Sequence, residues 1–182
     1  MDKTTEKQKI VKKIEDLHRL AAQYRGEIIT GATNVETHLE MIIADYFTDG
    51  NKKKSKELKH CLLSHNMFSF NIKKNLFLFI LKTKFPKTKI DGEDIDKIMN
   101  LRNLMAHGKL VFYHETLDEV INFDDNTITL YECKTTKNKI VSHPTKLTRE
   151  FVAKENKRML DLVTKLKEIL KTIKAEKKSA DT

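Results

Sequence analysis

The first 46 residues carry apolar side chains at alternating steps of three and four, the spacing of one face of an α-helix. This N-terminal stripe consists of Ile10, Ile14, Leu17, Ala21, Tyr24, Ile28, Ala32, Val35, Leu39, Ile42 and Tyr46. Its phase continues across Gly26 and Gly31, so it predicts either one very long helix or two helices that meet near these glycines. A stripe of this length is typical of a helix that packs against another helix, in the same chain or in a partner.

The next segment predicts two shorter helices. Ser55 is a candidate N-cap for a helix that ends near Leu63, preceded by a solvated lysine run at 52–54. Residues 68–84 again place apolar side chains at helical spacing, with the lysines mainly on the opposite face. Pro86 ends this second helix, because proline has no N–H to donate and its ring obstructs the preceding turn.

A further helix begins at the acidic residues 91–94, since the positive end of the helix dipole favours carboxylates. It ends near His107, and Gly108 occupies the position at which a left-handed residue often terminates a helix. We therefore expect the backbone to leave the helix at this glycine.

The pattern then changes to that of strands. Residues 120–123 and 127–131 flank a turn sequence and predict a β-hairpin, to which 140–141 adds a third short strand. The hairpin is expected as an insertion at about 115–143, before the C-terminal helix.

Thr148 is a candidate N-cap for the last helix. Its apolar face consists of Val152, Met159, Val163, Leu166, Leu170 and Ile173. The expected fold class is mainly α, a bundle of four to five helices in one domain at 1–174, with a disordered tail at 175–182.

The amino-acid composition and charge limit the classes of protein to which the chain can belong. The chain has 182 residues and a net charge of +9, and its 39% hydrophobic content argues against both a membrane protein and a disordered chain. The N-terminus lacks an apolar signal core, so a cytoplasmic location without membrane association is expected. The positive charge comes mostly from lysine, which is consistent with an RNA partner but equally with solubility alone.

One arginine stands in an unfavourable place. Arg102 falls in the middle of an apolar helix face. That face contains Ile95, Ile98, Met99, Met105 and Ala106. Because an unpaired buried guanidinium is costly, either a carboxylate such as Glu36 or Glu40 pairs with Arg102, or the site binds an anion.

His107 follows five residues later, about 140° around a straight helix. If the helix unwinds at Gly108, the imidazole can return to the side of Arg102. A guanidinium that binds phosphate and an imidazole that transfers a proton suit cleavage of a phosphodiester. The structural alternative is a histidine that only hydrogen-bonds a carbonyl at the helix end.

The segment Arg102-Asn103-Leu104-Met105-Ala106-His107 resembles the R-x4–6-H motif of HEPN-domain proteins, and the resemblance covers about residues 26–108. It implies a homodimer with a composite cleft and metal-independent RNA cleavage through the 2′-hydroxyl, without a cofactor. In this family His107 would act as general acid and base, and Arg102 would hold the phosphate. Asn103 would orient one of them, and Glu36 is a candidate supporting residue for Arg102.

The chain departs from the motif of one HEPN subfamily. HEPN toxins with the pattern R-x4-H-x-Y carry a tyrosine where this chain has Lys109, and Tyr113 is out of register. A toxin or phage-defence effector, with an antitoxin or regulatory protein as partner, is the cellular role that the family implies. The alternatives are a non-catalytic HEPN-like module that binds nucleotide, RNA or protein, and a dimeric regulator held together by the N-terminal stripe.

His60, Cys61 and His65 lack a second cluster at zinc-ligand spacing, so no metal site is expected.

Overall fold

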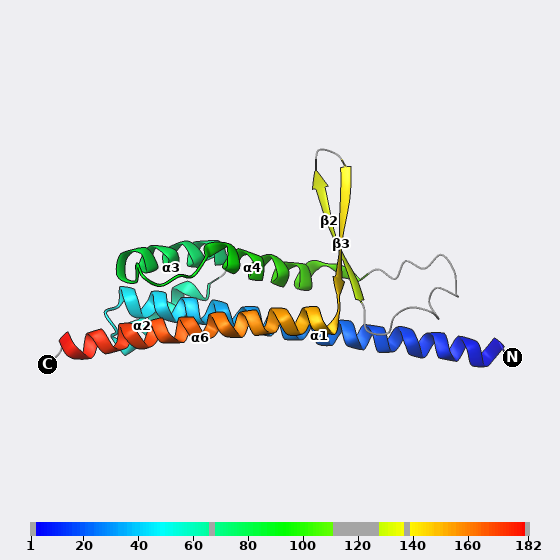
Figure 1. The fold of residues 1–182 in the computed structure, drawn as a ribbon, viewed down its shortest axis with the longest axis horizontal. Helices are drawn as coiled ribbons and strands as arrows, with labels where there is room; N and C mark the ends of the chain where they lie inside the picture. Colours follow the sequence, from blue (N-terminus) through cyan, green and yellow to red (C-terminus); the bar gives the residue numbers. More distant parts are fainter. Residues whose placement is uncertain (1–2, 66–67, 111–127, 137–138, 181–182) are drawn as a thin grey trace. The chain divides into compact units, whose positions relative to one another are not determined.

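The protein is mainly α-helical in its computed structural model, which confirms the expected class (Figure 1). The structure describes residues 3–65, 68–110, 128–136 and 139–180. Its elements are α1 (Lys3–Phe47), α2 (Lys52–Leu58), the π-helix η1 (Lys59–Leu63), α3 (Phe70–Lys84), α4 (Gly92–His107), β1 (Lys109–Leu110), β2 (Ile128–Thr136), β3 (Lys139–Leu147) and α6 (Arg149–Ala180). Within these described ranges, no helix combines the length and the apolar character needed to cross a bilayer.

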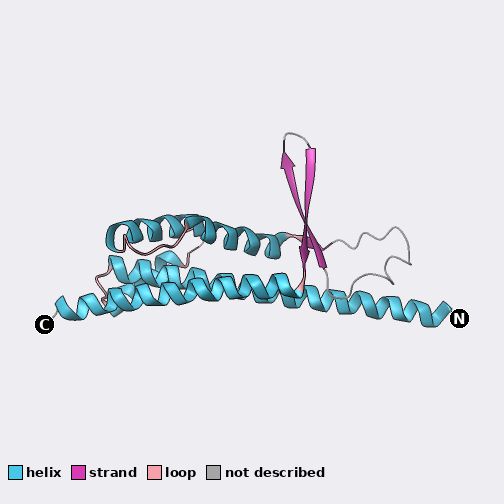
Figure 2. Ribbon diagram, in the orientation of Figure 1, coloured by secondary structure: helices cyan, strands magenta, loops and turns pink. Residues whose placement is uncertain are grey.

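The chain forms two compact units, each assembled from separate segments. Unit 1 contains Met1–Ile29 and Leu101–Asn156, and unit 2 contains Thr30–Asn100 and Lys157–Thr182. Helices α1, α4 and α6 each contribute residues to both units. Figure 2 shows that helix is the dominant secondary structure.

The N-terminal stripe belongs to one continuous helix, α1, of 45 residues. Most of the stripe is buried, from Leu17 to Ile42, whereas Ile10, Ile14 and Tyr46 are half-buried. The glycines do not divide the helix, because tertiary burial of an apolar face outweighs the roughly 1 kcal/mol that each helical glycine costs.

The α2 segment begins earlier than the sequence indicated. Its N-cap is Asn51, whose side chain accepts a hydrogen bond of 3.0 Å from the backbone N–H of Lys54. Ser55, the expected cap, instead donates to Asp45 Oδ1 at 2.5 Å. The lysine run at 52–54 therefore forms the first turn of a helix rather than a loop.

Helix α3 has Ser69 as its N-cap and buries Phe77, Ile80 and Leu81, as its spacing predicted. The expectation that its lysines lie opposite the apolar face is wrong for Lys73, which is 4% exposed. This buried lysine is explained by two carboxylate partners in unit 2, Glu36 and Glu40.

The strands form a three-stranded antiparallel sheet in the order β1-β2-β3. Ile128 pairs with Leu147 and Thr136 with Lys139, so β2 pairs mainly with β3. The pairing thus differs from the expected one: the strand at 140–141 is much longer, and the strand predicted at 120–123 lies outside the described residues. Pro144 is compatible with β3, because β3 is an edge strand and proline has no N–H for a second neighbour.

Helix α6 has the predicted cap, since Phe151 N–H donates to Thr148 Oγ1 at 3.1 Å. All six residues of its predicted apolar face are buried. The helix continues to Ala180, although a disordered tail was expected from residue 175. Alanine, glutamate and lysine in this segment are strong helix formers, which favours the extension.

Candidate functional site

The motif residues 102–107 lie in the last two turns of α4, within unit 1. Met105 is buried, Arg102 is half-buried, and both Asn103 and His107 are exposed. The helix therefore anchors this segment through its apolar side and leaves the polar side chains accessible.

Arg102 donates from Nη1 to Asn103 Oδ1 at 3.2 Å, and this hydrogen bond is exposed to solvent. No carboxylate pairs with Arg102 in the part of the chain that the structure describes. A guanidinium has five N–H donors, so one neutral amide leaves most of its hydrogen-bonding capacity for an anion.

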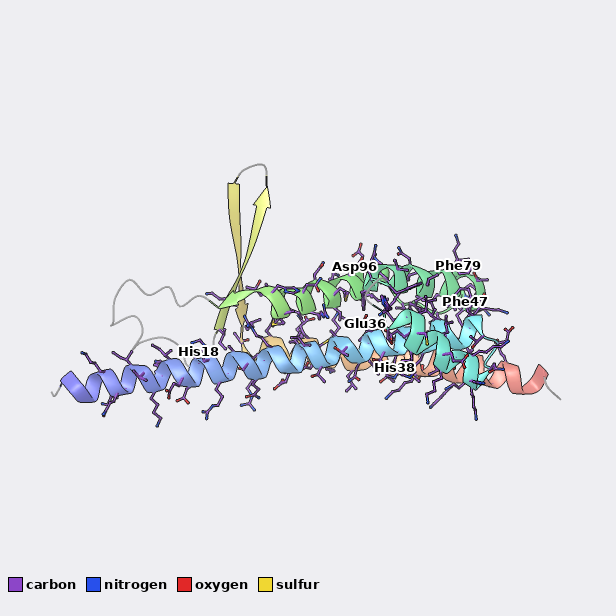
Figure 3. The ribbon with its side chains drawn as sticks, turned by 180° about the vertical axis from the view of Figure 1, so that it is seen from behind. His18, Glu36, His38, Phe47, Phe79 and Asp96 are labelled. Atoms are coloured by element: carbon purple, nitrogen blue, oxygen red, sulfur yellow. The ribbon has the colours of Figure 1, made fainter. Side chains whose placement is uncertain are left out.

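Glu36, expected to support Arg102, instead accepts a hydrogen bond from Lys73 at 2.6 Å within unit 2. Lys73 also donates to Glu40 at 2.7 Å, so both carboxylates proposed for Arg102 are engaged by this lysine. Figure 3 labels Glu36 on the part of α1 that belongs to unit 2. The sequence could not show this pairing, because it depends on which turns of α1 and α3 face each other.

The Lys73–Glu36–Glu40 cluster is a buried ion-pair network. The side chain of Lys73 is 5% exposed and that of Glu40 is 9% exposed. Burial by itself lowers the pKa of Lys73, but hydrogen bonds and charge interactions with Glu36 and Glu40 outweigh burial and raise it above the ordinary 10.5. Lys73 is therefore a charged structural residue.

His107 does not return to the side of Arg102, because α4 remains helical through His107. The N–H of Gly108 still donates to the carbonyl of Leu104 at 2.6 Å. Within one chain the two side chains accordingly leave the helix about 140° apart.

Gly108 is not the left-handed residue that the sequence indicated, since its φ is not positive. A Cβ at this position would collide with the backbone carbonyl oxygen of Leu104. Glycine is needed here for close approach rather than for a left-handed turn.

Sequence reasoning missed Arg25. This α1 residue donates from Nη2 to the carbonyl oxygen of Gly108 at 2.5 Å, and both residues belong to unit 1. The last carbonyls of a helix lack helical partners and attract cations, so Arg25 stabilises the end of α4 that carries His107. Its Nε is buried without a hydrogen-bond partner in the described structure. No motif marks Arg25, because its contact spans 83 positions.

Unit 1 also contains a hollow of about 550 Å³ along α1. Its charged lining residues are Lys9, Lys12, Lys13, Asp16 and Arg19. Arg19 pairs with Asp16 at 2.9 Å, on a strongly exposed surface. Basic side chains outnumber acidic ones in this lining, which makes the surface attractive to phosphate groups.

The described residues contain no group of three or more His, Cys, Asp or Glu side chains arranged to hold a metal ion. Comparison of the chain with protein-family models, curated proteins and solved structures finds no match.

Proposed function

We propose that this protein is a HEPN-type endoribonuclease that acts as a homodimer and cleaves RNA without a metal ion. One observation carries the proposal: Arg102 is half-buried with an amide rather than a carboxylate as its described partner, and the accessible His107 follows in the same helix. The similarity of residues 102–107 to the R-x4–6-H motif supplies their roles.

In the proposed reaction, Arg102 binds the non-bridging oxygens of the scissile phosphate and stabilises the charge that develops on them. A neutral His107 removes the proton from the 2′-hydroxyl while the 2′-oxygen forms a bond to phosphorus. The bond from phosphorus to the 5′-oxygen breaks, and a protonated imidazole donates to that leaving oxygen. The products are a 2′,3′-cyclic phosphate and a 5′-hydroxyl.

A homodimer accounts for the separation of Arg102 and His107 around α4. Two copies of the helix end, brought together, supply two arginines and two histidines to one cleft. One imidazole then acts as the base and the other as the acid.

RNA is the proposed substrate because its phosphates are negatively charged, whereas the chain has a net charge of +9 and basic side chains outnumber acidic ones in the hollow along α1. A toxin or phage-defence effector, controlled by an antitoxin or regulatory protein, is the cellular role that we propose by analogy with the HEPN family.

The second candidate is a non-catalytic module that binds nucleotide, RNA or protein, or a dimeric regulator. The observation in its favour is that Arg102 and His107 diverge around α4 within one chain. This candidate requires neither residue for a reaction.

The deciding experiment is RNA cleavage in EDTA by the wild type, His107→Ala and the control His38→Ala. His38 lies in unit 2 and bonds the carbonyl of Asn34 in its own helix. Cleavage with cyclic-phosphate ends that is lost only in His107→Ala supports the nuclease. No cleavage of several RNA pools by folded, dimeric wild type favours the binding module.

A further inference from the structure

Unit 2 contains a second hollow, of about 570 Å³, that no proposed catalytic residue lines. Cationic or titratable side chains from α2, η1 and α6 converge on it: Lys52, Lys56, Lys59, His60 and Lys174. We call this site the lysine hollow. Three of the four lysines come from residues 52–60, and the fold adds Lys174, which is distant from them in sequence.

The charge around the lysine hollow is unbalanced, because four lysines face two aspartates. Asp45 accepts from Ser55 at 2.5 Å and lies 3.6 Å from Lys174 Nζ. No ion pair joins Lys52, Lys56 or Lys59 to a carboxylate in the described part of the chain. Like charges that converge on a concave surface concentrate a positive potential, which attracts an anion.

The backbone around the lysine hollow is irregular as well. Lys59 and His60 belong to the π-helix η1, a rare conformation that occurs frequently at functional sites. Asp49, which lines the hollow, has φ 49° and is the non-glycine residue with positive φ among those described. Both features cost conformational energy, and such costs concentrate at binding sites.

We propose that the lysine hollow binds a ligand with several phosphate groups. Lysine ammonium groups act as mobile point charges that suit phosphates, and the volume lies in the range of small-molecule sites. The described lining contains no Phe, Tyr or Trp side chain, and its aromatic ring is the imidazole of His60, so recognition rests mainly on contacts to phosphate. The phosphates come either from a free polyphosphate or nucleotide, or from an RNA backbone. This proposal is independent of the proposed nuclease activity.

The test is calorimetric titration of the full-length chain with inorganic tripolyphosphate at low salt. Lys56→Gln and Lys174→Gln should each weaken binding about fivefold, which corresponds to one charge interaction at about 4 Å in water. The matched control is Lys53→Gln, because Lys53 is an exposed residue of α2 outside the hollow. The affinity of Lys53→Gln for tripolyphosphate should stay within about twofold of the wild-type value. Thermal melts verify that each variant is folded.

A second titration uses a short single-stranded RNA, and amide NMR locates each ligand. Shifts at Gly50 and Lys59 with both probes support a site for RNA phosphates, whereas shifts with tripolyphosphate alone support a free polyphosphate or nucleotide. The proposal is overturned if wild type does not bind tripolyphosphate, or if Lys53→Gln weakens binding as much as Lys56→Gln. RNA cleavage is measured separately, so failure of the nuclease proposal would not affect this result.

Discussion

Lys73 in unit 2 and Arg102 in unit 1 are both cations on apolar helix faces, but the fold provides for them differently. Lys73 is almost fully buried and donates to Glu36 and Glu40. Arg102 is half-buried, and its described partner is the amide of the next residue. A buried charge that the fold pairs twice is structural, whereas a half-buried charge left with one neutral acceptor is suited to a ligand.

The largest loss of stability is expected from Lys73→Met. This substitution leaves Glu36 and Glu40 close together without their shared cation, which should cost about 3–5 kcal/mol of stability. Urea denaturation measures the free energy of unfolding. The matched control is Lys74→Met, since Lys74 pairs with the half-exposed Asp96 at 2.7 Å and should contribute at most about 1 kcal/mol. Equal losses in the two variants would contradict the structural role of the cluster.

Arg102→Ala should lower RNA cleavage about 10²–10³-fold, the usual cost of a lost donor to the reacting phosphate. Its melting temperature should change little, because no carboxylate in the described structure loses a partner. Kinetics of cleavage and a thermal melt measure the two effects. A large loss of stability with unchanged cleavage would make Arg102 a structural residue and remove the contrast with Lys73.

Arg25→Ala tests whether the end of α4 is held from α1. Loss of a charged hydrogen bond to the Gly108 carbonyl should destabilise the protein by about 1.5–3 kcal/mol and speed hydrogen exchange at the Gly108 amide. Arg25→Lys should restore part of the protection. Arg19→Ala is the control, because Arg19 forms an exposed pair with Asp16 on the same helix. Unchanged exchange in Arg25→Ala would exclude Arg25 as a residue that positions His107.

The smallest expected effect is a change in the stability contribution of Lys73 at alkaline pH. Because the folded pKa of Lys73 is raised, its contribution is fully present below the unfolded value of 10.5 and is lost as pH rises through the folded pKa. The stability difference between wild type and Lys73→Met should therefore shrink above pH 10.5. Chemical denaturation at several alkaline pH values measures this difference, and a constant gap would mean that Lys73 acts through packing alone.

Local features were predictable from the sequence. The N-terminal stripe predicted helix along the length of α1, although it left open one helix or two. Thr148 was correctly identified as the cap of α6, and the spacing at 68–84 predicted α3. These features depend on interactions between residues a few positions apart. Where two local signals competed, the prediction was wrong: Asn51 rather than Ser55 caps α2, because Ser55 has a partner in Asp45.

By itself, then, the sequence determined which segments form the main helices and that Arg102 occupies an apolar face, because helical period is a local property. Only the tertiary structure decided that Glu36 and Glu40 pair with Lys73, and that Arg25 holds the carbonyl after His107. It also gathered the lysine hollow from α2, η1 and α6. The physical reason is that side-chain partners 33 to 83 positions apart depend on which turns of packed helices face each other, and periodicity does not encode that register.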